Sequence, residues 1–110
     1  MRTIRFIRAR SLFACSMTAY IVFDEEDDKR VTVKNGSDIT IEIDEQSHTI
    51  FAVWVEGYFR NKKLRRSEPL TIKTGTNPIE INVEMRYFSF DPPEFILVNR
   101  NDTLLKNILK

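Results

Sequence analysis

The chain has 110 residues, of which 42% are apolar, 11% aromatic and 30% charged, and 17 Lys and Arg against 16 Asp and Glu leave a net charge of +1. This length fits a single domain, residues 1–110, that buries roughly two-thirds of its unfolded surface, and the apolar content excludes a disordered chain. A net charge so close to zero gives no overall field toward nucleic acid or a membrane surface, so any such attraction must come from a local cluster.

Targeting and redox signals are weak. Cys15 is the single cysteine, which excludes an intramolecular disulfide, and we expect it to be a small buried hydrophobic side chain. Arginines at positions 2, 5, 8 and 10 precede an apolar stretch, but too little apolar sequence separates them from Cys15 for a lipoprotein signal. No run reaches the roughly 18 apolar residues of a membrane-spanning helix. We therefore expect a cytoplasmic protein, or a soluble piece of something larger.

The first half of the chain predicts five short β-strands, because apolar residues recur at every second position, as they do on one face of a strand. The expected strands are Ile4–Ala9, Thr18–Phe23, a run around Val31 and Val33, Ile39–Ile43, and His48–Val55. The segments between them are a loop or bulge at Ser11–Ser16, a connection at Asp24–Lys29 and a turn at Asp44–Ser47. The strand His48–Val55 is apolar on both faces over part of its length, so we expect it at the centre of a sheet.

Asn35-Gly36 is the strongest short-range hairpin signal in the chain. Both residues tolerate the positive φ angles of a type I′ turn, and β-branched runs flank them on both sides. We expect the strands before and after this turn to be antiparallel neighbours.

The second half predicts a long loop or twisted hairpin and then three more strands. The elements are the loop or hairpin Glu56–Arg66, a strand Leu70–Lys73, a turn Gly75–Pro78, a strand Ile79–Arg86 with one wet face, and a last strand Glu94–Val98. Asp91-Pro92-Pro93 should form a corner before that last strand, because proline donates no hydrogen bond to a ladder.

The end of the chain, residues 98–110, changes period and predicts one or two helical turns. Asn101 or Asp102 can cap this helix. Its apolar face would consist of Leu104, Leu105, Ile108 and Leu109. Because so short a helix is not stable alone, this face either seals its own domain or docks on a second copy.

Seven or eight strands with turn signals between them predict an all-β fold: an antiparallel β-sandwich of immunoglobulin-like outline with a short C-terminal helix. A closed barrel is the alternative, because it buries alternating strand faces in the same way.

The same residues resemble a family of small bacterial β-sandwich domains of uncharacterised function. The likeness rests on a basic first strand, a strand ending near Asp24, the hairpin tip Asn35-Gly36 and the corner His48-Thr49-Ile50, and it covers about Arg2–Val83. The chain departs from the family at Glu45-Gln46-Ser47, where a proline and a glycine are missing. The resemblance implies an immunoglobulin-like or carboxypeptidase-regulatory-like sandwich and no catalytic residue.

Few residues offer chemistry. His48 is the sole histidine, which excludes a zinc site built on a histidine pair, and at a turn-to-strand junction it should tether the turn by a hydrogen bond. Catalysis through Cys15 and His48 is the weaker alternative. The acidic run Asp24–Asp28 lacks the alternate-residue ligands of a calcium loop, which favours a solvated connection. We therefore expect no enzyme, metal or cofactor.

A basic group is the best candidate binding feature. It places five cations in seven residues beside aromatic side chains, and its members are Tyr58, Arg60, Lys62, Lys63, Arg65 and Arg66. Cations with adjacent aromatic rings suit phosphate contacts and base stacking, but no nucleic-acid-binding motif is present. A solvated loop is the plainer interpretation.

An aromatic-rich end surrounds the two prolines and contains Tyr87, Phe88, Phe90 and Phe95. In a sandwich such rings are usually core, and the alternative is an exposed platform for a sugar or a partner. The sequence as a whole predicts a non-enzymatic interaction module that binds a protein or self-associates through an edge strand or the C-terminal stripe. Binding of an anion or nucleic acid through Arg60–Arg66 is the less favoured alternative, and no membrane contact is expected.

Overall fold

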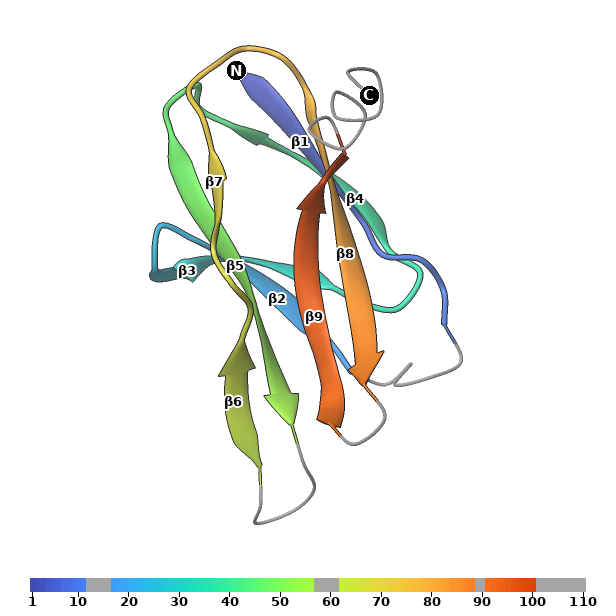
Figure 1. The fold of residues 1–110 in the computed structure, drawn as a ribbon. Coiled ribbons are helices and arrows are strands. Elements are labelled where there is room, and N and C mark those ends of the chain that lie inside the picture. Colours follow the sequence, from blue (N-terminus) through green and yellow to red (C-terminus); the bar gives the residue numbers. More distant parts are fainter. Residues whose placement is uncertain (12–16, 57–61, 89–90, 101–110) are drawn as a thin grey trace, which may run out of the picture.

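The computed structural model describes residues 1–11, 17–56, 62–88 and 91–100, apart from the side chains at 27, 87, 88 and 91–93. In these ranges the chain forms nine β-strands (Figure 1). They are β1 (Arg2–Ile7), β2 (Ala19–Phe23), β3 (Glu26–Val33), β4 (Asp38–Ile43), β5 (His48–Glu56), β6 (Lys63–Arg66), β7 (Leu70–Ile72), β8 (Ile79–Phe88) and β9 (Asp91–Asn99). The all-β prediction is confirmed. The predicted C-terminal helix lies outside the described residues.

The strands are divided between two sheets. One has four strands in the order β4-β1-β8-β9, and the other has five, in the order β3-β2-β5-β6 with β7 also paired to β5 (Figure 1). Two separate sheets make the molecule a sandwich and not a closed barrel. The strand β5 has neighbours on both sides, which confirms its predicted central position.

The four-stranded sheet is mixed, which corrects the expectation of purely antiparallel sheets. Strands β1 and β8 pair in parallel, with Ile4 opposite Ile79 and Ile7 opposite Asn82. The other described pairs in both sheets are antiparallel. A parallel pair requires a long crossover, and here the connection passes through the whole second sheet, so local sequence could not reveal it.

The predicted alternation of strand faces is confirmed in the core. The inward-facing side chains from β1, β2, β5, β8 and β9 are almost completely buried between the sheets, among them Ile4, Phe6, Ile21, Ile50, Ile81 and Phe95. Two edge-to-face ring pairs join the sheets: Phe6 with Phe23 at 6.1 Å, and Trp54 with Phe95 at 5.3 Å between centroids. Phe95 is therefore core, as expected for the aromatic-rich end.

The turn at Asn35-Gly36 does not join paired strands, contrary to the hairpin prediction. Strand β3 pairs with β2, and β4 pairs with β1 in the other sheet, so the chain crosses between sheets at this point. Gly36 has a φ of 74°, and the amide of Ser37 donates to the carbonyl of Lys34, as in a tight turn. The side chain of Asn35 is fastened to the backbone of Ser11, which directs the chain away from β3.

The acidic run does not form the predicted connection. Asp24 and Glu25 are a two-residue hairpin turn with φ angles of 53° and 61°, and β3 begins at Glu26. Two consecutive positive φ angles are what a tight hairpin of this twist requires, although Asn and Gly are the usual residues. The hairpin therefore lies at Asp24-Glu25 and not at Asn35-Gly36, where the sequence indicated it.

Two further elements differ from expectation. The basic segment contains a strand, β6, which pairs with β5, so the twisted hairpin is the correct alternative for Glu56–Arg66. Strand β9 begins at Asp91 and includes both prolines, which corrects the predicted corner. The pairing shifts between Arg86 and Phe88, and β9 is an edge strand, where proline is tolerated at a bulge.

Two arginines, one in β1 and one just after it, anchor the start of the chain to the rest of the sandwich. Arg2 is buried and donates to the carbonyls of Asn77 and Lys73 at 2.6 Å each. Arg8 is buried as well, donates to the carbonyls of Met17 and Val33, and lies 4.8 Å from the centroid of Phe95. These two arginines therefore contribute buried hydrogen bonds and ring contacts to the fold, and they are not solvated surface charges.

The Phe6 ring connects the sheets, so its removal should destabilise the sandwich strongly. We expect Phe6→Ala to lower the free energy of unfolding by about 3–5 kcal/mol, because it leaves a cavity between sheets. Thr40→Ala, on the exposed face of neighbouring β4, should change it by no more than about 0.5 kcal/mol. Urea denaturation of both variants measures the difference, and equal effects would contradict the described core.

Candidate functional site

The outer face of the four-stranded sheet is covered by ion pairs. Arg5 contacts the carboxylates of Asp38 and Glu80, at 2.7 Å from Nε to Asp38 and 3.2 Å to Glu80. Arg100 contacts the other oxygen of Glu80 at 3.2 Å. Such a charged ladder is typical of a face in contact with water.

The outer face of the five-stranded sheet is different, because apolar side chains dominate it. They form the floor of a hollow of about 720 Å³ and come from β2, β5 and β6: Tyr20, Val22, Phe51, Val53, Val55 and Leu64. Leu64 is 74% exposed and Val55 47%. Val22 and Phe51, which lie beneath them, are only 3% and 6% exposed, so Leu64 and Val55 are the side chains that this face presents to a partner. We call it the apolar face.

Two arginines border the apolar face and lie over its aromatic rings. The guanidinium of Arg66 is 3.9 Å from the centroid of Phe51, and that of Arg30 is 5.3 Å from the centroid of Tyr20. Phe51 is only 6% exposed. The Arg66 guanidinium also lies 3.5 Å from a carboxylate oxygen of Glu25, at the tip of the β2–β3 turn. Both rings are thus already occupied by cation–π contacts.

The structure divides the predicted basic group. Lys62, Lys63, Arg65 and Arg66 are all exposed. Arg65 pairs with Glu56 at 2.9 Å, whereas Arg66 belongs to the apolar face. Tyr58 and Arg60, like the C-terminal stripe Leu104, Leu105, Ile108 and Leu109, lie outside the described residues.

The histidine joins two turns, which confirms its predicted role as a tether. His48 Nδ1 lies 2.6 Å from a carboxylate oxygen of Asp24, and Nε2 lies 2.7 Å from one of Asp44. Asp24 also accepts the amide hydrogen of Thr49, and its own amide donates to the Thr49 carbonyl. The start of β5 is in this way fastened to the β2–β3 turn and to the β4–β5 crossover.

Both contacts are hydrogen bonds only when His48 is the imidazolium, since a neutral ring has a single N–H. The hydrogen bond to Asp24 is the main cause that raises the pKa of His48 above its ordinary value. In turn, the hydrogen bond from His48 is the main cause that lowers the pKa of Asp24 and of Asp44. The side chain of His48 is 14% exposed, so the tether is partly shielded from water.

A second pocket, of about 350 Å³, opens beside this tether between the edge strands β3 and β4. Aliphatic side chains such as Val31, Ile41 and Ile43 line its inner part, and charged groups including Lys29, Arg30 and Glu42 line its rim. Asp24, Asp44 and His48, whose contacts form the tether, line this pocket as well.

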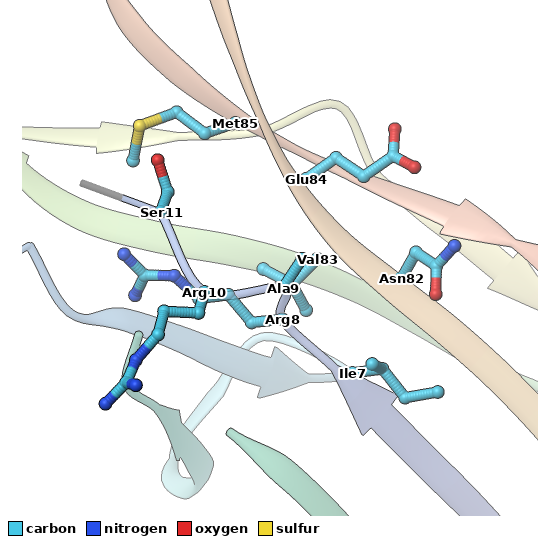
Figure 2. Close-up of a pocket in the computed structure, with 9 residues that line it drawn as sticks. All are labelled: Ile7, Arg8, Ala9, Arg10, Ser11, Asn82, Val83, Glu84 and Met85. Atoms are coloured by element: carbon cyan, nitrogen blue, oxygen red, sulfur yellow. The ribbon is translucent and has the colours of Figure 1, made fainter. Parts of the chain in front are cut away.

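A third pocket, of about 370 Å³, lies where β1 diverges from β8 (Figure 2). The parallel pairing ends at Ile7 and Asn82. Beyond that point Arg8 donates its amide to the carbonyl of Ser37, and the chain follows the Lys34–Ser37 turn instead of β8. Glu84 and Met85 project to opposite sides of β8 (Figure 2). The pocket is accordingly a consequence of strand divergence.

Other chemistry is sparse in the part of the chain that the structure describes. No three His, Cys, Asp or Glu side chains there are grouped as metal ligands, and no helix there is long and apolar enough to cross a membrane. Cys15, the alternative nucleophile, lies outside that part. No family model, curated protein or solved structure matches the chain.

Sequence reasoning missed the apolar face, although a signal was present. The strand β2 reads Ala-Tyr-Ile-Val-Phe and has no polar residue on either side, and β5 carries Phe51, Val53 and Val55 opposite its core residues. For His48–Val55 we interpreted this two-sided character as a sign of central position only. In β5 the same pattern also indicates that the outer face of the sheet is apolar.

Stability should depend on pH through His48. A raised histidine pKa stabilises the fold fully below the ordinary value of 6.5, and that contribution is lost as the pH rises through the folded-state pKa. The lowered aspartate pKa values act in the opposite direction and are lost on acidification below 3.8. The tether should therefore stabilise most between these limits.

The measurement is urea denaturation of the wild type and His48→Gln from pH 5 to 9. The difference in unfolding free energy between them should shrink as the pH rises, since Gln keeps hydrogen bonding but not the titration. An NMR titration that places the pKa of His48 at or below 6.5 would contradict the tether.

Proposed function

We propose that the chain is a non-enzymatic protein-binding module whose partner covers the apolar face of the five-stranded sheet. The observation that carries this proposal is the contrast between the two outer faces. One is a ladder of ion pairs around Arg5, and the other is apolar with Leu64 and Val55 exposed. Burying such side chains against a partner is favourable at about 25 cal/mol per Å².

The composition of the apolar face fits a protein partner. Aromatic and arginine side chains are enriched in protein interfaces, and here Tyr20, Phe51, Arg30 and Arg66 lie together beside aliphatic ones. Cation–π stacking also holds the two guanidinium groups in place, so less side-chain entropy is lost on binding.

Nucleic-acid binding has less support. Base stacking needs exposed ring faces, but Arg66 covers Phe51 and Arg30 lies over Tyr20. Exposed cations such as Lys62 and Lys63 could still attract an anion, with affinity that falls with salt. The immunoglobulin-like outline, the bacterial family resemblance and the cytoplasmic location stay predictions from the sequence.

The test is a random-peptide display selection on the immobilised chain, followed by affinity measurements on two variants. Val55→Glu and Leu64→Glu place a carboxylate at exposed positions of the apolar face. Each should weaken the selected peptides by about tenfold or more, because the carboxylate loses water without a partner. Thr40→Glu, exposed on the other outer face, is the matched control and should leave affinity unchanged.

Selected peptides that bind both apolar-face variants as well as wild type would contradict the proposal, as would a selection that returns no binder. The solution mass of wild type and variants should be measured in parallel. A dimer that Leu64→Glu dissociates would make a second copy the partner of this face.

A further inference from the structure

We propose that the free edge of β6 receives an extended acidic segment of a partner protein, which adds a further strand to the five-stranded sheet. This inference rests on the proposed function, because it names the segment with which such a partner binds. Strand addition to an exposed edge is a recurrent mode of peptide recognition, in which backbone hydrogen bonds supply affinity and side chains supply specificity.

The first argument is the open edge. Among the described strands β6 pairs with β5 alone, at the end of the sheet order (Figure 1). Its ladder partners are Trp54 opposite Arg65 and Val55 opposite Leu64. The hydrogen-bonding groups on the other side of this strand therefore point away from the sheet.

The register shows which groups these are. The amide of Ser67 donates to the carbonyl of Ala52 at 2.8 Å, which continues the β5–β6 register by one residue. Hydrogen-bonded and non-hydrogen-bonded pairs alternate along an antiparallel ladder. The backbone of Arg65 thus bonds to β5, whereas the N–H and C=O groups of Leu64 and Arg66 point to the free edge.

The second argument is charge. Four exposed cations lie on or next to β6, namely Lys62, Lys63, Arg65 and Arg66. The carboxylates that they contact are Glu56, at 2.9 Å from Arg65, and Glu25, at 3.5 Å from Arg66. The cations thus outnumber these carboxylates. Charges on an edge strand repel unselected strands, and a surplus of cations selects an acidic one.

The third argument is continuity with the apolar face. The outward-pointing residues Leu64 and Arg66 also line the hollow above Val55 and Phe51. A strand added at the edge would place every second side chain beside them, because side chains alternate along a strand. On that surface an apolar residue of the segment would pack against Leu64, and a carboxylate would pair with Arg66. The segment should therefore contain both apolar and acidic residues.

A second copy is a poorer occupant. The acidic start of β3 is the part of another molecule that could compete, but Glu26 already pairs with Lys29 at 3.0 Å and Arg30 follows in the same strand. Nucleic acid is poorer as well, since it has no strand to pair with the Leu64 and Arg66 backbone.

The experiment uses three synthetic probes and the full chain. The first is a short peptide of alternating Val and Glu, the second is the same peptide N-methylated at every second amide, and the third has Lys in place of Glu. We expect the first to bind, the N-methylated peptide to bind about tenfold or more weakly because it lacks strand hydrogen bonds, and the Lys peptide not to bind. Backbone NMR should show the largest shifts in Lys63–Arg66.

Two variants test the edge directly. Leu64→Pro removes an N–H that points away from β5, and proline is tolerated at such edge positions, so it should abolish binding of the Val–Glu peptide. Leu64→Ala removes the side chain but keeps the N–H and should retain most of it. If Leu64→Pro does not fold, the N-methylated peptide still tests the edge.

The outcomes separate this inference from the proposed function. If the display-selected peptides depend on Val55 while the Val–Glu peptide binds no better than its N-methylated form, the edge inference is wrong and the apolar face stands. If neither set depends on this sheet, both are wrong. Salt-sensitive binding of an RNA oligonucleotide that displaces the Val–Glu peptide, or a dimer held by β6, would overturn the inference in favour of those occupants.

Discussion

The structure depends on the two-sided apolar character of β2 and β5. Their inward faces supply Ile21, Ile50 and Trp54 to the core between the sheets. Their outward faces carry Val22, Phe51 and Val53, over which no described strand lies, although Val22 and Phe51 are themselves only 3% and 6% exposed. A strand buries both faces only when a layer of structure covers each of them. The four-stranded sheet covers the inner face of β2 and β5, and we propose that the partner covers the outer face.

The same sheet contains a turn, between β2 and β3, whose residues are unfavourable for its backbone conformation. Asp24 and Glu25 adopt positive φ angles without a glycine, a conformation that costs a residue with a Cβ about 1–2 kcal/mol. The contacts of Asp24 with His48 and with the backbone of Thr49 offset that cost. This turn also places Glu25 beside Arg66, at the border of the apolar face. His48 therefore helps to position that border, although His48 itself does not line the apolar face.

Local pattern predicted the strands well and their pairing poorly. The alternation of Ile4 and Phe6 or of Ile79 and Ile81 reports a buried face, whatever strand lies alongside. Whether β3 pairs with β4 or crosses to the other sheet depends on distant contacts, such as the bond between Asn35 and Ser11. The Asp24–Glu25 hairpin was missed because propensity assigns such turns to Asn and Gly, and tertiary hydrogen bonds overrode it here.

For the candidate site, the sequence identified the cations of the basic group but did not predict which side chains they contact. It placed Arg65 and Arg66 in a long loop or a twisted hairpin, and the structure places Arg66 in the strand β6, where it stacks on Phe51. That contact arises from the register of β5 with β6, which no local motif encodes. The apolar face could have been inferred from β2 and β5, because their outward residues are apolar as well as their inward ones.

The most direct test of this account is methyl-resolved NMR of the chain in complex with a peptide selected on it. Val53, Val55 and Leu64 supply methyl groups on the apolar face, and Ile4, Ile81 and Val83 supply them in the core. The account predicts intermolecular contacts from the peptide to the first set and none to the second or to Thr40. Contacts confined to the outer face of β1 and β4 would contradict it.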